Sequence, residues 1–336
     1  MRLVNRVGPL TWQPAIDGEV TLRVVESGQL AALERAFERH REIEPRVMPA
    51  VPQPYTRART AAAEPAAIST FSGDWIVFRR VGGPSFPMAA TAGIARAVRK
   101  TLMSYADEPI PETLSGHTAD QRPSQRPHLA IAPLPFVGHE HASGALLGVA
   151  LVLPRATSTG DRRAVYNAVA RWEEKYRQGD EDTPVVQLNL GAAGELHLER
   201  VEWGSVQVSL RPQVWSGPAD VWYSVTPVAL DRNPGDLRSR DPRKVAEATD
   251  EAREIICLAC ERIDLPRPTY VEILPAAPWA GAERARSYPP YPGDRSRAQR
   301  VLTHVRIEFE QHVKGPILLG AGRYVGLGLF RPEASR

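Results

Sequence analysis

Glycine is concentrated in the stretch GAGRYVGLG near the end of the chain, which holds Gly320, Gly322, Gly326 and Gly328. Glycine has no side chain to block a close approach, so such a stretch can bring backbone N–H groups to a phosphate, here with Arg323 as a cation. The stretch does not match the dinucleotide-binding fingerprint GxGxxG, because position 325 is valine and too few residues follow to form the helix of that motif. It does not match a Walker loop either, because no GKS or GKT follows. We expect a phosphate-contacting loop or a tight turn, and no nucleotide cofactor.

Two other groups of residues have types that could bind a metal. His139 and His141 flank Glu140 in GHEHASG, but alternate residues of an extended segment point to opposite sides, which favours a solvated turn. Cys257 and Cys260 lie in a stretch with helical periodicity, and no second pair completes a zinc site. We therefore expect buried thiols, no metal and no cofactor.

Composition sets broad limits on the class of protein. The 336 residues, 43% of them hydrophobic, suffice for two domains. No apolar run could span a bilayer and no signal peptide is evident, so a cytoplasmic location without membrane association is expected. The basic residues are nearly all arginine, whose planar fork suits phosphate, although a GC-rich genome gives the same bias.

The middle of the chain alternates strand and helix patterns. Strands are expected at 74–81, 128–137, 145–154, 185–190 and 195–201, and helices at 88–106 and 161–178. This succession, β-α-β-β-α-β with a closing hairpin, is typical of a ferredoxin-like unit.

The same order then begins again. Strands are expected at 221–230, 269–278, 304–313 and 326–330, and a helix at 242–263. The glycine-rich stretch takes the place of the second helix. The predicted fold is α+β, with two tandem ferredoxin-like units, the second degenerate. The predicted domains are 71–205 and 206–336, after an irregular N-terminal segment 1–70.

That N-terminal segment has a strand pattern at 20–25 and a helical pattern at 27–43. Residues 44–67 are rich in proline, alanine and arginine without periodicity, which predicts a linker or extended arm.

Tandem ferredoxin-like units with a glycine-rich loop before the last strand resemble the RAMP proteins of CRISPR antiviral systems, and most closely their repeat-processing endoribonucleases. Three stretches narrow the resemblance: LSGHTADQRPSQRPHLAIAPLPFVGHEHASGALLGVALVLPR, WYSVTPVALDRNP and GPILLGAGRYVGLGLFRP. They look like the processing region of the fused subunit of type I-U (I-G) systems, the GSU-type family. The resemblance implies that segment 1–70 is the remnant of a preceding RAMP domain.

The resemblance further implies a metal-independent endoribonuclease that cuts precursor crRNA within its repeats. The 2′-hydroxyl attacks the neighbouring phosphate, leaving a 2′,3′-cyclic phosphate and a 5′-hydroxyl, and histidine can move the protons. The family's catalytic histidine commonly lies on the first helix of the first unit or in the loop after it. His117, in LSGHTADQRP, occupies that loop beside Gly116. His128, at the start of the next strand, is a second proton-transferring group, a residue that orients His117, or a partly buried histidine capping the strand.

RNA binding needs a charged track with surfaces for bases. Besides the glycine-rich stretch and Arg323, the residues expected to bind RNA are Arg122, Arg126, Arg238, Arg240, Arg243 and Lys244. In 283–300, arginines alternate with Tyr288 and Tyr291, which suits a hairpin or a single strand, or is an ordinary solvated loop. The expected partners are precursor crRNA, mature crRNA and other subunits of the type I-U/I-G Cascade complex.

Two alternatives remain open at this stage. The chain could be a non-cleaving crRNA-binding subunit, because RAMP folds often bind RNA without cutting it. A metal hydrolase built on GHEHASG is the third hypothesis, and it would need carboxylate ligands that the nearby sequence does not obviously provide.

Overall fold

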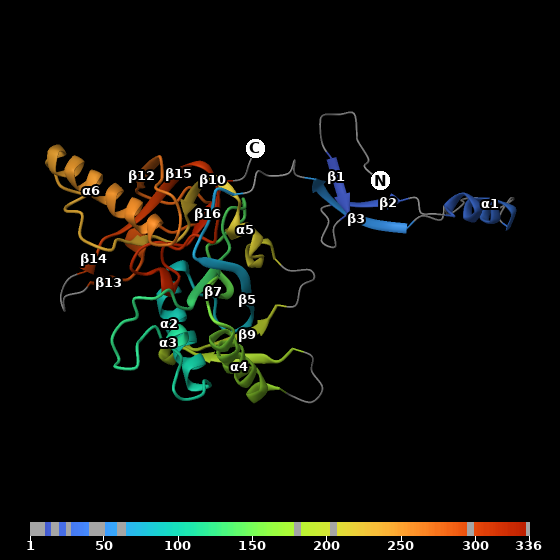
Figure 1. The fold of residues 1–336 in the computed structure, drawn as a ribbon, viewed down its shortest axis with the longest axis horizontal. Helices are drawn as coiled ribbons and strands as arrows, with labels where there is room; N and C mark the ends of the chain where they lie inside the picture. The colour runs from blue at the N-terminus through green and yellow to red at the C-terminus, as the bar shows by residue number, and fades with distance from the viewer. Residues whose placement is uncertain are drawn as a thin grey trace. The chain divides into compact units, whose positions relative to one another are not determined.

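The computed structural model describes residues 11–14, 20–24, 28–39, 51–58, 65–177, 183–201, 207–293 and 299–333. The chain divides into two compact units, residues 1–63 and 64–336, and each is described by itself (Figure 1). Both contain helices and β-sheets, so the expected α+β class is confirmed.

The N-terminal unit contains a three-stranded antiparallel sheet in the order β1-β3-β2 and one helix. Its elements are β1 (Thr11–Pro14), β2 (Val20–Val24), α1 (Gln29–Arg39) and β3 (Val51–Ala58). The linker expectation is wrong for β3, while residues 44–50 and 59–64 of that segment lie outside the described residues. Pro52 and Pro54 argued against a strand because proline cannot donate to a ladder. Both nevertheless lie in register with β2, opposite Arg23 and Thr21.

The second unit begins its first sheet with a succession of strand, helix, two strands, helix and hairpin. The strands are β5 (Phe71–Gly82), β6 (Ala130–Pro135), β7 (Leu146–Pro154), β8 (Val185–Asn189) and β9 (Glu195–Arg200), and the helices are α2 (Thr91–Ser104), the short α3 (Glu112–Ser115) and α4 (Thr159–Tyr176). All neighbouring strands are antiparallel, in the order β6-β7-β5-β9-β8.

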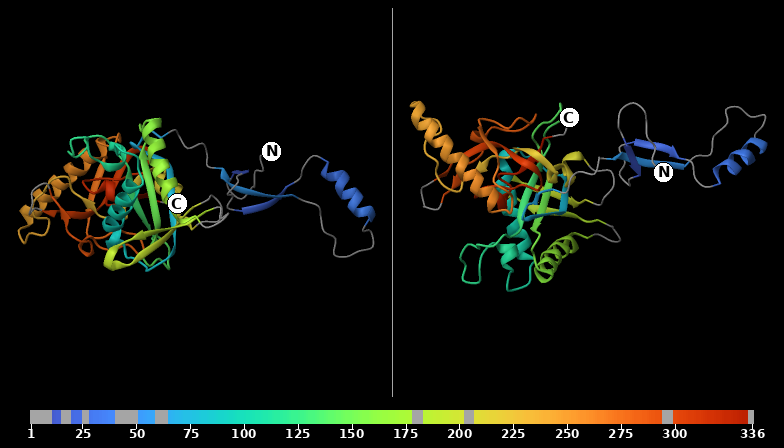
Figure 2. Two further views of the ribbon diagram at one scale, coloured as in Figure 1. Left: turned by 90° about the horizontal axis from the view of Figure 1, so that it is seen from below. Right: turned by 45° about the horizontal axis from the view of Figure 1, so that its top comes forward.

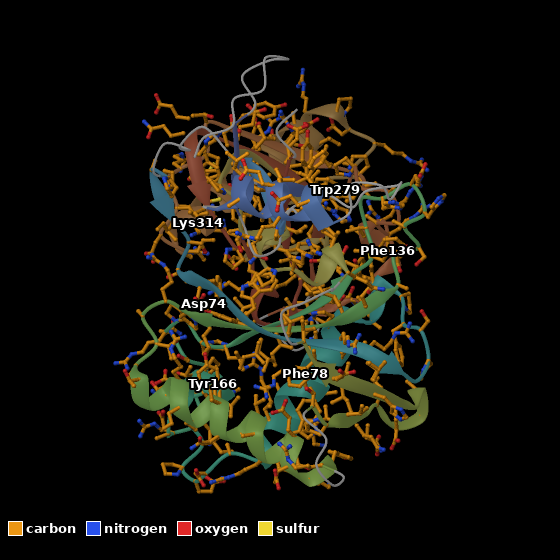
Figure 3. All side chains as sticks on the ribbon, turned by 90° about the vertical axis from the view of Figure 1, so that its right-hand side faces the viewer. Asp74, Phe78, Phe136, Tyr166, Trp279 and Lys314 are labelled. Carbon is orange, nitrogen blue, oxygen red and sulfur yellow. The ribbon has the colours of Figure 1, made fainter. Side chains whose placement is uncertain are left out.

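Strand alternation explains how this sheet is covered on both faces. On one face Phe78 of β5, labelled in Figure 3, contacts Trp172 of α4, and their ring centroids are 5.5 Å apart. Helix α2 contributes Ile94, Val98 and Leu102 to the same core, at the spacing of an amphipathic helix. The preceding residue of β5, Val77, faces the opposite way. It belongs to a core that is shared with the second sheet.

The second sheet is organised around one long strand, β15. It pairs antiparallel with β10, β11 and β12 and parallel with β4, while β16 pairs with β10. The strands are β4 (Ala67–Ile68), β10 (Ala219–Ser224), β11 (Val228–Ala229), β12 (Tyr270–Leu274), β15 (Leu302–Lys314) and β16 (Phe330–Pro332), with helices α5 (Gln213–Ser216) and α6 (Pro242–Glu261). A separate ribbon pairs β13 (Tyr291–Pro292) with β14 (Gln299–Arg300).

Within the second unit, the first sheet with α2 and α4 lies on one side and the second sheet with α6 on the other (Figure 2). Helix α6 begins at the N-cap Asp241, whose carboxylate accepts the N–H of Arg243 at 3.0 Å. Its buried stripe includes Ala252, Ile256 and Cys260, so both cysteines serve the core as expected.

Residues 315–329, all described, connect β15 to β16 and contain one short turn of 3-10 helix, η5 (Arg323–Val325). The glycine-rich stretch therefore occupies the place of the second helix, which was expected to be absent from this unit. The predicted strand at 326–330 is wrong in its first part, because φ is +76° at Gly326 and +68° at Gly328 and strand geometry begins only at Phe330. Among the described helices, none is long and apolar enough to cross a membrane.

Candidate functional site

His128 and Tyr324 bring the two halves of the second unit into contact. Their rings stack with centroids 3.5 Å apart and an interplanar angle of 25°. His128 is buried just before β6, and Tyr324 is the central residue of η5. The predicted catalytic region and the predicted glycine loop, about 200 residues apart in the sequence, thus form one site.

The imidazole of His128 is held in one orientation and one charge state. Its Nδ1 lies 3.2 Å from the carbonyl oxygen of Arg126, which can only accept, so Nδ1 donates and Nε2 carries the lone pair. Burial lowers the pKa of His128 to about 4, and the positive charge of Arg99 acts in the same direction. His128 is therefore neutral at neutral pH.

His117 is exposed and lies beside His128. Helix α3 ends at Gly116, whose φ of +74° is the left-handed conformation that glycine adopts without strain. A Cβ at position 116 would lie 2.8 Å from Nε2 of His128, so only glycine fits there. His117 follows directly, and its positive form lowers the pKa of His128.

The side chain of His117 has one nitrogen engaged and one open. Nδ1 lies 3.1 Å from the carbonyl oxygen of Ser115, which makes Nδ1 the donor and Nε2 the acceptor in the neutral ring. The backbone N–H of His117 also donates to Oγ of Ser115, at 3.2 Å. Nε2 is thus available to accept a proton from a bound molecule.

Arg99 of α2 ties this loop to the glycine-rich stretch. Its guanidinium donates to the carbonyl oxygens of Leu114 and Leu129, both at 2.6 Å, and to that of Tyr324 at 2.9 Å. Burial lowers its pKa to about 10, so the group stays protonated at neutral pH. Arg99 therefore supplies a buried positive charge and fixes three backbone segments.

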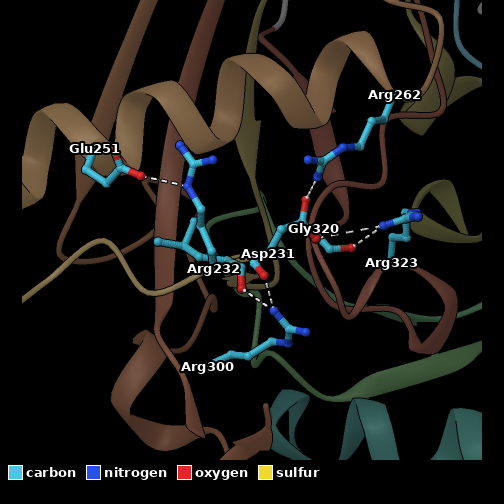
Figure 4. A network of polar contacts seen from close by, with 8 residues as sticks. Asp231, Arg232, Glu251, Arg262, Arg300, Gly320 and Arg323 are labelled. Carbon is cyan, nitrogen blue, oxygen red and sulfur yellow. Dashed lines mark hydrogen bonds and ion pairs between the residues drawn. The ribbon is translucent and has the colours of Figure 1, made fainter. Parts of the chain in front are cut away.

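Arg323 adds a second cation to the site. Its guanidinium lies 4.6 Å from the ring centroid of Tyr324 and donates to the carbonyl oxygen of Gly320 at 3.0 Å. The carboxylate of Asp231 is 4.0 Å away and also pairs with Arg262, while Arg300 donates to the Asp231 carbonyl (Figure 4). The Asp231 carboxylate therefore lies between two arginines, Arg262 and Arg323, while Arg300 bonds its backbone.

The four glycines of the stretch are all buried. A Cβ at Gly320 would lie 2.3 Å from the carbonyl oxygen of Ala229, and one at Gly328 would lie 2.1 Å from that of Leu319. At Gly326 it would meet Pro133 of β6 at 2.8 Å, so the stretch packs directly on the first sheet. Packing accounts for these glycines, and the half-buried residues between them are Ala321, Arg323, Tyr324 and Val325.

The other residues predicted to bind RNA fall into two groups. Arg122 and Arg126 are exposed in the loop that carries His117, and Arg122 pairs with Asp120 at 2.9 Å. Arg238, Arg240, Arg243 and Lys244 are exposed before and at the start of α6. In the described part of the chain, no hydrogen bond or ion pair joins this second group to His117 or His128. Arg295 and Arg297 lie outside the described residues.

The remaining candidates have ordinary structural settings. His139 stacks on Phe136, with ring centroids 5.9 Å apart. Across the described ranges, no cluster of three or more histidine, cysteine or acidic side chains is arranged to hold a metal ion.

Sequence reasoning missed two residues of the site, Arg99 and Tyr324. Arg99 directly follows Val98, whose side chain is part of the buried stripe of α2. A charged residue beside buried apolar positions indicates that its charge has polar partners in the fold. Tyr324 is the only aromatic residue within GAGRYVGLG.

Comparison with protein-family models identifies a family for this chain. The family described as CRISPR-associated protein, GSU0054 family, matches residues 4–332, which includes most of the N-terminal segment as well as both sheets of the second unit. No curated protein and no solved structure matches the chain significantly. Because the match extends over nearly the whole sequence, this protein belongs to the CRISPR-associated GSU0054 family.

Proposed function

We propose that this protein is a metal-independent endoribonuclease that matures CRISPR RNA by cutting precursor crRNA within its repeats. The observation that carries the proposal is the meeting of His117 and His128 with Arg323 and Tyr324 at one place. An exposed histidine beside two arginine side chains has the groups that cleavage by an internal 2′-hydroxyl requires.

The residues have distinct roles in this reaction. Nε2 of His117 takes the proton of the 2′-hydroxyl, whose oxygen attacks the adjacent phosphorus while the bond to the 5′ oxygen breaks. The leaving oxygen takes a proton from water, and the products carry a 2′,3′-cyclic phosphate and a 5′-hydroxyl. Arg323 stabilises the extra negative charge on the phosphorane.

His128 acts as a positioning residue. With its pKa lowered to about 4 the ring is neutral at neutral pH, and its one N–H is held by the carbonyl oxygen of Arg126, so it cannot act as a general acid. Its packing against Gly116 and its stack on Tyr324 instead fix the loop that presents His117.

The RNA itself follows the exposed basic residues, Arg122 and Arg126 near the reacting phosphate and Arg238, Arg240, Arg243 and Lys244 further along. The mature crRNA stays bound, and the protein joins the other subunits of a type I-U/I-G effector complex.

Topology supports the RAMP interpretation of the fold. We interpret the order β6-β7-β5-β9, with α2 and α4 as crossovers, and the order β12-β15-β10-β16, with α6, as two ferredoxin-like units, the second lacking a helix. We propose two domains at 71–205 and 206–336, preceded by the N-terminal segment 1–70.

A second candidate function is a non-catalytic crRNA-binding subunit of the same complex. The low pKa of His128 favours it, because a neutral, buried His128 cannot serve as a general acid near neutral pH.

The decisive experiment incubates the protein with its repeat RNA, labelled at the 5′ end, in the presence of EDTA. We expect one cut, a cyclic phosphate on the labelled product, and no cut when the nucleotide before the scissile phosphate is a 2′-deoxynucleotide. Binding without cleavage would establish the non-catalytic subunit instead. Cleavage that needs an added divalent cation would favour a metal hydrolase.

A further inference from the structure

A cavity of about 410 Å³ lies between α2 and the segment that carries Tyr288 and Tyr291. This volume is within the range of about 300–1,000 Å³ that is usual for small-molecule sites. Alanines of α2, Pro289 and Pro290 make its walls largely apolar, and Leu327 of the glycine-rich stretch closes one side. The cavity is therefore next to the site described above but separate from its histidines.

A cation and an aromatic ring stand together in the lining. The guanidinium of Arg96 lies 5.5 Å from the ring centroid of Tyr291. Arg96 is exposed, and within the described part of the chain no carboxylate is close enough to pair with it. The hydroxyl of Tyr291 donates to the carbonyl oxygen of Ala321 at 3.2 Å, which fixes the ring. Arg96 can therefore bind an anion beside an immobile aromatic surface.

One polar group of the lining has unused hydrogen-bonding capacity. The carboxamide oxygen of Asn189 accepts the N–H of Gly191 at 2.7 Å, which leaves its N–H groups for another acceptor. An apolar cavity with a few such groups discriminates between ligands by their polar edges.

Helix α2 connects this cavity to the proposed cleavage site. Arg96 and Arg99 are one helical turn apart, so they lie on neighbouring positions of one face. Arg99 contacts Tyr324, and Tyr291, beside Arg96, contacts Ala321 of the same glycine-rich stretch. A nucleotide strand whose reacting phosphate lies at Arg323 can place a nearby base in the cavity.

We propose that this cavity binds one unpaired nucleobase of the repeat RNA, close to the cleavage point, with Arg96 holding its phosphate. A flat apolar ring with hydrogen-bonding edges and an attached anion matches the aromatic wall, the amide N–H groups of Asn189 and the unpaired arginine. This inference rests on the proposed RNA-processing function and adds a base-binding subsite to it.

Gly93 of α2 allows the cavity to be filled without disturbing the fold. It is an exposed lining residue, and a Cβ built there has no atom within 4 Å. Gly93→Leu therefore adds a side chain to the cavity and also improves helix propensity. Gly160→Leu, at an exposed position of α4, is the matched control.

The test measures affinity for repeat RNAs in which each unpaired nucleotide in turn is abasic. With wild-type protein and with Gly160→Leu, we expect one position to weaken binding by about tenfold. Gly93→Leu should bind intact RNA about tenfold more weakly and should be indifferent to the abasic change at that position. Arg96→Gln should weaken binding while remaining sensitive to the missing base.

The outcomes separate the two proposals. If the wild type binds intact RNA tightly, but no abasic position matters or Gly93→Leu binds normally, the base pocket is wrong and the RNA-processing function stands. If the wild type does not bind repeat RNA, both proposals fail. Cleavage is not the readout, so a binding-only subunit could also contain this pocket.

Discussion

The imidazole of His128 lies flat against the phenol ring of Tyr324, 3.5 Å between centroids. One ring belongs to the loop before β6, and the other to a turn that follows nearly all other elements along the chain. Because Arg99 bonds the backbone on both sides of this stack, the two loops are held as one rigid surface. The proposed chemistry depends on that surface.

His117→Ala should lower the rate of repeat cleavage by about 10²- to 10⁴-fold, the usual contribution of a general base. Affinity for repeat RNA should change little, because His117 is exposed and supports no core contact. Single-turnover cleavage and filter binding measure the two quantities. His139→Ala removes another exposed histidine of the same sheet and should cleave normally; an unchanged rate in His117→Ala would contradict the assignment.

His128→Phe and His128→Ala distinguish positioning from proton transfer. Phenylalanine retains a ring that can stack on Tyr324, whereas alanine leaves a cavity. If His128 only positions its neighbours, His128→Phe should cleave within about tenfold of wild type and His128→Ala should be much slower, since misplaced groups cost about 10²-fold. Equal loss of activity in two variants that unfold at the same denaturant concentration would show that His128 transfers a proton.

Arg99→Met should destabilise the protein by about 3 kcal/mol, because three buried carbonyl oxygens lose a charged donor. Lys100→Met, at the next and exposed position of α2, should change stability by less than about 0.5 kcal/mol. Urea unfolding followed by tryptophan fluorescence measures both. Equal stabilities for the two variants would contradict the bridging role of Arg99.

Stability should fall in mild acid because of two buried histidines. The pKa values of His128 and His304 are lowered by burial to about 4, below the ordinary value of about 6.5 in the unfolded chain. The unfolded state therefore binds more protons between these pH values, and stability present above pH 6.5 is lost as pH falls toward 4. Each histidine should contribute about 2 kcal/mol to the loss between pH 7.5 and pH 5.

His304→Gln separates this effect from general acid sensitivity. The imidazole of His304 contacts Oγ of Ser224 at 3.1 Å and the carbonyl oxygen of Glu283 at 3.0 Å, and glutamine can form polar contacts without titrating. The variant should have a shallower dependence of unfolding free energy on pH. His312→Gln, at an exposed position of β15, is the matched control for the substitution itself.

Much of the second unit was predictable because its patterns are regular. The helical stripes of α2, α4 and α6 and the apolar runs of β6 and β7 indicate elements that the structure contains. Strand β3 was not predictable from local rules, because its prolines oppose a strand and only pairing with β1 and β2 stabilises it.

The composition of the site was less predictable than the fold. His117, His128 and Arg323 could be named from their types and neighbours, but their proximity depends on how the glycine-rich stretch packs against β6. Arg99 has no local partner, since Leu129 and Tyr324 are distant in sequence. Contacts of this kind depend on tertiary packing, which no short sequence pattern encodes.

Gly326→Ala tests whether the glycines of GAGRYVGLG are needed for packing. The substitution forces a left-handed conformation on alanine and places its Cβ 2.8 Å from Pro133 and 2.9 Å from Thr91. We expect a loss of about 2–5 kcal/mol, the sum of backbone strain and overpacking. Gly191→Ala has a similar φ of +62° but open space around the Cβ, so it should lose only about 1–2 kcal/mol. If the two variants are equally stable but only Gly326→Ala binds repeat RNA poorly, the glycines contact RNA directly instead of holding Arg323 and Tyr324 against the first sheet.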